Sequence, residues 1–242
     1  MNPLGQFVVR PLFHINLFGF EFPFTNSACW MVIAVLCSVM LLWILAHPQR
    51  LIPDTGQSVA ESLFTFMRHT AQETIGENYQ PYVPFLLSVF LFIFMGNFLG
   101  LLPYAFTFTS QLAPVGAFAL MGLVLCMSVG IYKMGWRWFR TFMPPGIPLL
   151  LAPLIIPIEV ISFLAKPFSL TVRLVMNMIV GHILLELLAG FIFKAGLLGI
   201  FPLLFMGILI IFEIGISFLQ AYIFTVLTSI YLGEALHQEE NT

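Results

Sequence analysis

Ionisable side chains lie deep inside long apolar stretches in the last third of the chain. Burying such a group in apolar surroundings is costly, so each one calls for a partner or a role. Together they offer a permanent cation, carboxylates, an imidazole and primary amides, which is the set of groups that proton-relay pathways use. The residues are Glu159, Arg173, Asn177, His182, Glu213 and Gln220, with Lys166 and Glu186 in the same stretches.

The spacing of these residues predicts a polar stripe along one helix. Glu159, Lys166 and Arg173 are seven residues apart, so successive members drift by only about 20° around an α-helix. Asn177 continues this face four residues after Arg173, whereas His182 points away from the direction of Arg173. We therefore expect His182 to face a neighbouring helix or the wall of a cavity.

A second polar stripe occurs in the apolar stretch that follows. Glu213, Ser217 and Gln220 share one helical face there. Two long helices joined by a short connection can pair such stripes. This pairing would bring Arg173, Asn177 and His182 opposite Glu213 and Gln220.

Each ionisable residue also has a plainer interpretation. Arg173 alone could form a structural ion pair, and Lys166 could extend its amine to the membrane surface. His182 could be a hydrogen-bonded packing residue, and Glu186 could lie at the interface. The conjunction of these groups on two apolar helices favours proton transfer over any of these separate explanations.

The composition indicates the solvent in which these helices fold. Of 242 residues, 60% are hydrophobic and only 8% are charged, with a mean hydropathy of +1.01. Soluble domains carry about 25% charged residues, so this chain has too few polar side chains to cover a soluble surface. An all-α, polytopic membrane protein in the lipid bilayer is therefore predicted. The net charge of −2 and the lack of basic runs argue against nucleic acid as a partner.

The apolar stretches predict about five membrane helices and one amphipathic helix at the membrane surface. The first three spans are expected at 27–46, 82–102 and 112–132, and the amphipathic helix at 54–79. The stretches 147–193 and 196–235 each exceed the roughly 20 residues of a perpendicular crossing, so they should form a long tilted hairpin. Within the first of them, Pro157 and Pro167 are places where the chain can bend.

The chain is interpreted as a single membrane domain over residues 1–242. Basic residues in the first and third connections, among them Arg50, Lys133 and Arg137, put those connections inside and the N-terminus outside. The expected parts are an outer N-terminal segment at 1–26, the first three spans and the interfacial helix at 27–143, the polar-striped hairpin at 144–235, and an inner tail at 236–242.

Three segments resemble a known family. The segment Glu159–Met178, EVISFLAKPFSLTVRLVMNM, is similar to the signature helix of ATP synthase Fo subunit a. The segment Phe218–Leu232, FLQAYIFTVLTSIYL, resembles the last helix of that family, and Asn97 with Gly100–Pro103 resembles a motif of its second span. The resemblance extends over the whole chain in the order and number of segments.

The resemblance implies roles for particular residues. Arg173 matches the essential arginine that faces the rotating ring of c subunits. Asn177, His182, Glu213 and Gln220 match positions of the half-channel open to the outer side, and Glu159 matches a position near the inner half-channel. The placement of His182 and Glu213 resembles the mitochondrial and alpha-proteobacterial pattern, because some bacterial relatives carry Glu and His at these two positions in the opposite order.

The resemblance also implies partners and a location. The partners would be the c-subunit ring, peripheral stator subunits of the b type and the rest of an F-type ATP synthase. The location would be the bacterial plasma (inner) membrane or the mitochondrial inner membrane. No P-loop is present, so nucleotide chemistry would occur elsewhere in the complex, and neither a cofactor nor a metal is expected.

Other function classes remain open at this point. A haem- or quinone-binding electron-transfer subunit would need two buried histidines on facing helices, and only His182 lies deep in a span. A secondary transporter remains an alternative, although no internal sequence repeat supports it. An intramembrane protease is disfavoured by the lack of a serine motif of the GxSxG type.

Overall fold

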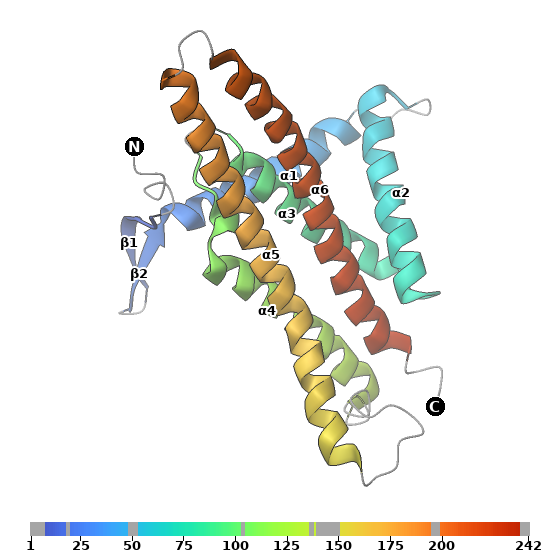
Figure 1. Cartoon of the computed structure of the whole chain (residues 1–242). Helices are drawn as coiled ribbons and strands as arrows, with labels where there is room; N and C mark the ends of the chain where they lie inside the picture. The colour runs from blue at the N-terminus through green and yellow to red at the C-terminus, as the bar shows by residue number, and fades with distance from the viewer. Residues whose placement is uncertain are drawn as a thin grey trace.

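The computed structural model describes residues 8–17, 20–47, 53–102, 105–135, 138, 151–194 and 199–237. A hairpin of two strands comes first, followed by helices that make up nearly all of the described chain (Figure 1). The strands are β1 (Pro11–Leu17) and β2 (Phe20–Thr25). The helices are α1 (Asn26–Ala46), α2 (Thr55–Ile75), α3 (Val83–Gly100), α4 (Leu112–Met134), α5 (Ala152–Lys194) and α6 (Ile200–His237), with short 3-10 turns η2 (Gln80–Tyr82) and η3 (Phe108–Ser110).

The predicted fold class is confirmed. Five helices of the described chain are long and apolar enough to cross a membrane, and α2 is not among them. Each predicted span corresponds to one of these helices, with ends that differ by a few residues. The assignment of inner and outer sides stays a prediction, and Arg50, Arg137 and Arg140 lie outside the described residues.

The N-terminal hairpin is an addition that the sequence analysis did not anticipate. Its strands pair antiparallel, with a register that runs from Pro11 opposite Thr25 to Leu17 opposite Phe20. The rings of Phe13 and Phe24 stack across it at 4.7 Å between centroids. Thr25 then ends the hairpin and begins α1, because its hydroxyl accepts a hydrogen bond from the Ala28 amide at 3.3 Å.

The two long helices confirm the predicted hairpin and its excess length. At a rise of 1.5 Å per residue, the 43 residues of α5 extend about 65 Å, roughly twice the 30 Å of the hydrocarbon core. Helix α6 has 38 residues, which extend about 57 Å and also exceed the hydrocarbon core. The two lie side by side in opposite directions, and α1 runs across their direction (Figure 1). Helices of this length fit within the hydrocarbon core only if they tilt strongly away from the bilayer normal.

Helix α5 continues through both of its internal prolines, Pro157 and Pro167, so the predicted bends do not interrupt it. Pro167 has no amide proton and leaves the carbonyl of Phe163 without its usual donor four residues later. The hydroxyl of Tyr231 on α6 donates a hydrogen bond to this carbonyl at 3.2 Å. The neighbouring helix thus compensates the backbone defect, as membrane helices with proline require.

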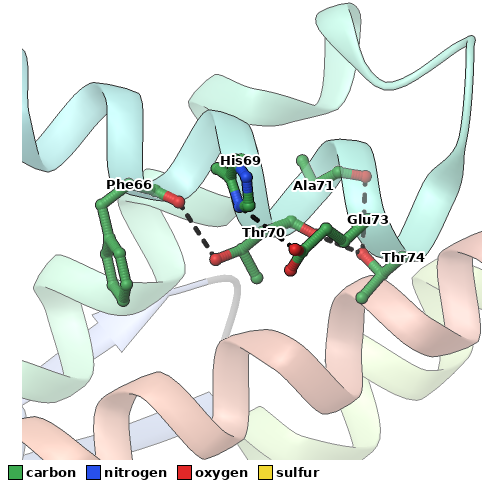
Figure 2. A network of polar contacts seen from close by, with 6 residues as sticks. All are labelled: Phe66, His69, Thr70, Ala71, Glu73 and Thr74. Atoms are coloured by element: carbon green, nitrogen blue, oxygen red, sulfur yellow. Dashed lines mark hydrogen bonds and ion pairs between the residues drawn. The ribbon is translucent and has the colours of Figure 1, made fainter.

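Helix α2 separates an exposed polar side from a side packed on α6. On the exposed side, His69 and Glu73 form an ion pair at 3.3 Å (Figure 2). The hydroxyls of Thr70 and Thr74 donate to carbonyls of their own helix in the same view. Thr74 also forms a short hydrogen bond with Ser229 of α6. This arrangement confirms the amphipathic character predicted for 54–79.

The core forms where α3, α4 and α5 surround α6. Phe90 and Leu91 of α3, Leu174 of α5 and Phe224 of α6 are all nearly inaccessible there. Because α5 packs its Leu174 side into the core, the opposite side of α5 is exposed.

Candidate functional site

Buried polar side chains gather where α3, η3, α5 and α6 meet. Several of their atoms have no hydrogen-bond partner within the described part of the chain, although buried polar groups are normally paired. Leaving one such group unpaired costs about 1–3 kcal/mol. The atoms are both amide atoms of Asn97, Oγ1 of Thr109, Oε2 of Glu213 and Oγ of Ser217. We call Asn97, Thr107, Thr109, His182, Glu213 and Ser217 the polar cluster.

Glycines permit the close approaches that build the polar cluster. A Cβ at Gly181 would overlap Oε1 of Glu213, so the acid side chain lies directly against the backbone of α5, next to His182. A Cβ at Gly100 would lie only 2.6 Å from Cγ2 of Thr107. The GxxxG spacing of Gly96 and Gly100 therefore serves packing against residues 107–109, rather than the close helix contact that the motif usually indicates.

His182 is held by a hydrogen bond to the segment between α3 and α4. Its Nε2 lies 2.8 Å from Oγ1 of Thr107. His182 was expected to face a neighbouring helix or the wall of a cavity, and its observed partner lies instead in the connection between two helices. Glu213 lies against Gly181, the residue before His182 in the chain. Both the carboxyl group and the imidazole can gain and lose protons.

Glu213, Ser217 and Gln220 form the buried stripe predicted on α6. All three are at most 8% exposed. Nε2 of Gln220 donates to the carbonyl of Leu170 at 3.4 Å, and so connects this stripe to the turn of α5 before Arg173. This part of the predicted pairing of α5 with α6 is present.

Arg173 lies on an exposed part of α5 that borders α6, and within the described residues it makes no hydrogen bond to the polar cluster. It belongs to an exposed face that includes Glu159, Lys166 and the apolar Met176 and Val180. Across the described residues, no hydrogen bond or ion pair joins Arg173, Asn177 or Glu159 to another side chain. The expected pairing of Arg173 and Asn177 with Glu213 is therefore not seen as a hydrogen bond or ion pair, and it stays a prediction. The side of α5 that packs in the core carries Leu170, Leu174 and Met178.

A cavity of about 360 Å³ opens beside Arg173, between α5 and α6. Arg173, Lys166 and Ser169 supply its polar lining, and none of its lining residues is acidic. Nζ of Lys166 also lies 5.6 Å from the ring centroid of Tyr231, a cation–π distance. Such a cavity attracts a carboxylate, because two cations line it at the edge of an apolar surface.

Sequence reasoning missed part of the site. Thr107 and Thr109 lie between the predicted spans 82–102 and 112–132 and were not predicted as site residues, although four hydroxyl or amide side chains within five residues, 107–111, were a usable signal. Asn97 was noted as a motif residue and not as a site residue. Pro103, the last residue of that motif, lies outside the described residues. The described residues contain no group of three His, Cys, Asp or Glu side chains that could hold a metal ion.

Comparisons with known proteins agree with these observations. Residues 28–233 match the family ATP synthase A chain. The protein named ATP synthase subunit a from Rhodospirillum rubrum is 42% identical over 237 residues, covering 98% of each chain. Those from Nitrobacter winogradskyi and Agrobacterium fabrum are each 39% identical, again covering 98% of each chain. With the five apolar helices, these relatives identify a multi-pass protein of the bacterial inner membrane.

Proposed function

The chain belongs to the ATP synthase A chain family, and on this premise we propose that it is the stationary proton-translocating subunit of a rotary F-type ATP synthase. In this function it offers two offset half-channels to a ring of c subunits and couples proton flow to rotation of the ring. The b-type stator subunits would hold it still. Nucleotide chemistry would belong to other subunits of the complex.

The polar cluster supports an outer half-channel. Its unpartnered polar atoms can hydrogen-bond to water molecules, which can carry a proton along the path. His182 and Glu213 supply the groups that change protonation state, and Asn97 and Ser217 supply neutral donors and acceptors. Gln220 belongs to the same proposed path, because it connects the buried stripe of α6 to the turn before Arg173. Asn177, four residues after Arg173, is assigned to this path by the family resemblance alone.

The exposed face of Arg173 supports a moving partner. The faces of α5 and α6 around it carry large exposed apolar side chains, among them Val180 and Phe212. Such a surface fits other apolar helices, and one carboxylate on each partner helix would meet the guanidinium in turn. The ionised carboxylate is stabilised beside Arg173, whereas the protonated form can face lipid at modest cost. This difference in cost permits the ring to rotate once a carboxylate has been protonated.

A permanent positive charge between the half-channels also opposes a direct proton leak. The guanidinium stays charged in proteins, whereas a buried lysine can lose its proton. One charge that moves across 100 mV is worth about 2.3 kcal/mol, and a leak would release this energy as heat. Glu159, on the exposed face of α5 and 14 residues before Arg173, is assigned to the inner half-channel. The N-terminus is assigned to the outer side.

The observation that carries the proposal is the exposed Arg173 beside a cation-lined cavity, on the same helix pair that holds the buried Glu213 and the half-buried His182. The test replaces Arg173 by alanine in the complete complex in membrane vesicles. Proton-driven ATP synthesis should be lost while the complex still assembles. Lys194→Ala, which removes an exposed cation from the end of the same helix, is the matched control and should retain synthesis. Normal synthesis by Arg173→Ala would refute the proposal.

A further inference from the structure

Thr107 forms two hydrogen bonds through one hydroxyl. Its Oγ1 lies 2.8 Å from Nε2 of His182 and 3.3 Å from the carbonyl oxygen of Gly100. Gly100 is the last residue of α3, so its carbonyl is one of those that a helix leaves without an internal donor. Within the described residues, the Thr107 hydroxyl is the donor assigned to it.

The direction of both hydrogen bonds follows from the count of protons. A carbonyl oxygen can only accept, so the Thr107 hydroxyl must donate its single proton to Gly100. The same oxygen is then left as an acceptor for His182, and Nε2 of the imidazole must carry a proton. We propose that Thr107 is a positioning residue that fixes His182 in the Nε2–H tautomer, so that Nδ1 is the nitrogen that accepts and returns a proton. This inference rests on the proposed function for the direction of proton flow, but the tautomer itself does not.

The segment that carries Thr107 is held firmly enough to serve this purpose. The hydroxyl and the amide of Ser110 donate to the carbonyl of Thr107 at 2.6 and 3.1 Å. The amide of Gln111 donates to the carbonyl of Phe108 at 3.1 Å and completes the η3 turn. Thr107 itself is 4% exposed and lies against Gly100, where any Cβ would collide with it.

In the fixed tautomer, Nδ1 alone takes up and releases protons. Neutral His182 takes a proton on Nδ1 and becomes an imidazolium, while Nε2–H remains bonded to Thr107. The same proton then leaves from Nδ1, and the neutral Nε2–H form returns with no net change. In the opposite tautomer, the accepting nitrogen would be occupied by Thr107, and the ring would have to turn before each transfer.

The test compares Thr107→Val, which removes the hydroxyl at nearly constant volume, with Thr107→Ser, which keeps it. Nitrogen NMR of the assembled complex with labelled histidine rings reports which nitrogen is protonated, and the His182→Gln complex identifies the His182 signals. Wild type and Thr107→Ser should show Nε2–H, and Thr107→Val should show both tautomers. A wild-type Nδ1–H signal, or an unchanged tautomer in Thr107→Val, would overturn the proposal.

A functional measurement accompanies the spectra. ATP synthesis by Thr107→Val should fall roughly two- to tenfold, the loss expected from one hydrogen bond, and Thr107→Ser should recover it. Thr225→Val is the control, because Thr225 is fully buried and donates within its own helix to Ala221. Full synthesis by Thr107→Val would overturn the positioning role. The NMR spectra do not depend on ATP synthesis. If they show the Nε2–H tautomer while Arg173→Ala still makes ATP normally, only the proposed function is refuted.

Discussion

Replacing Gly181 by alanine should displace Glu213 without unfolding the protein. A Cβ at position 181 would overlap Oε1 of Glu213 and lie 2.7 Å from its Cδ, but 3.5 Å from its Cγ. The last distance is an ordinary contact, so the carboxyl group alone has to move. To restore an ordinary contact of 3.4 Å, Cδ must retreat by about 0.7 Å.

The magnitude of the effect differs between stability and function. Turning one flexible carboxyl group away from its preferred rotamer costs about 0.5–1.5 kcal/mol, which a helical protein of this size should tolerate. The alanine offsets part of this cost, because it is favoured over glycine in a helix by about 1 kcal/mol. Misplacing a proton-transfer group by close to 1 Å, by contrast, can reduce a rate by as much as about 100-fold. We therefore expect normal assembly with proton-driven ATP synthesis reduced about 10- to 100-fold.

The assay measures ATP synthesis and ATP-driven proton pumping in vesicles that contain equal amounts of assembled complex. Gly190→Ala is the matched control, because Gly190 lies on the same helix and a Cβ there meets nothing within 4 Å. If Gly181→Ala acts through Glu213, its effect should shrink in the Glu213→Asp background, where the acid is one methylene shorter. Equal synthesis by Gly181→Ala and Gly190→Ala would refute the proposed role of this contact.

Two further predictions concern helix packing and the buried acid. Gly233→Ala should lower the unfolding temperature of the purified complex, with a cost of about 1–3 kcal/mol, because its Cβ would strike the backbone carbonyl of Thr74, which cannot swing aside. Gly207→Ala, where the space is open, is the control, and equal temperatures for the two variants would contradict the packing. Exchanging His182 for Glu and Glu213 for His together should retain more ATP synthesis than either change alone, because one acid and one imidazole remain. Equal loss in all three variants would count against a shared proton.

Helix α5 shows which features could be predicted from the sequence and which could not. The seven-residue spacing of Glu159, Lys166 and Arg173 predicted one common face, and all three are exposed on that face. This prediction depends only on the geometry of a single helix. Whether the face turns inward or outward depends on the neighbours, and α5 buries its apolar Leu174 side while α6 buries its polar Glu213 side. Hydrophobic periodicity carries no information about that choice when both faces must contact either lipid or protein.

Thr107 illustrates the second limit of the sequence. Its role depends on a connection between helices that folds back on the end of α3, and such a turn has no period from which to predict it. The GxxxG spacing of Gly96 and Gly100 usually indicates close contact between helices, but here the missing Cβ atoms make room for residues 107–109 of a connection. The two strands at 11–25 were missed for a related reason, since a single short hairpin gives a weaker signal than an apolar span.

The glycines Gly100 and Gly181 carry the same physical argument at two places in the polar cluster. Each removes a Cβ at a point where a polar tip reaches helix backbone: the Thr107 hydroxyl at Gly100 and the Glu213 carboxyl at Gly181. A larger residue at either place would put a methyl group between the polar atom and the backbone. Close contact with backbone restricts where a hydroxyl or carboxyl can point, and hydrogen bonds then select its direction. Under the proposed function, Arg173 would have the opposite requirement: it would need to reach successive partner helices, which an exposed side chain free of internal ion pairs among the described residues can do. Fixed groups on the buried side of α5 and a free cation on its exposed side are therefore two consequences of one helix orientation.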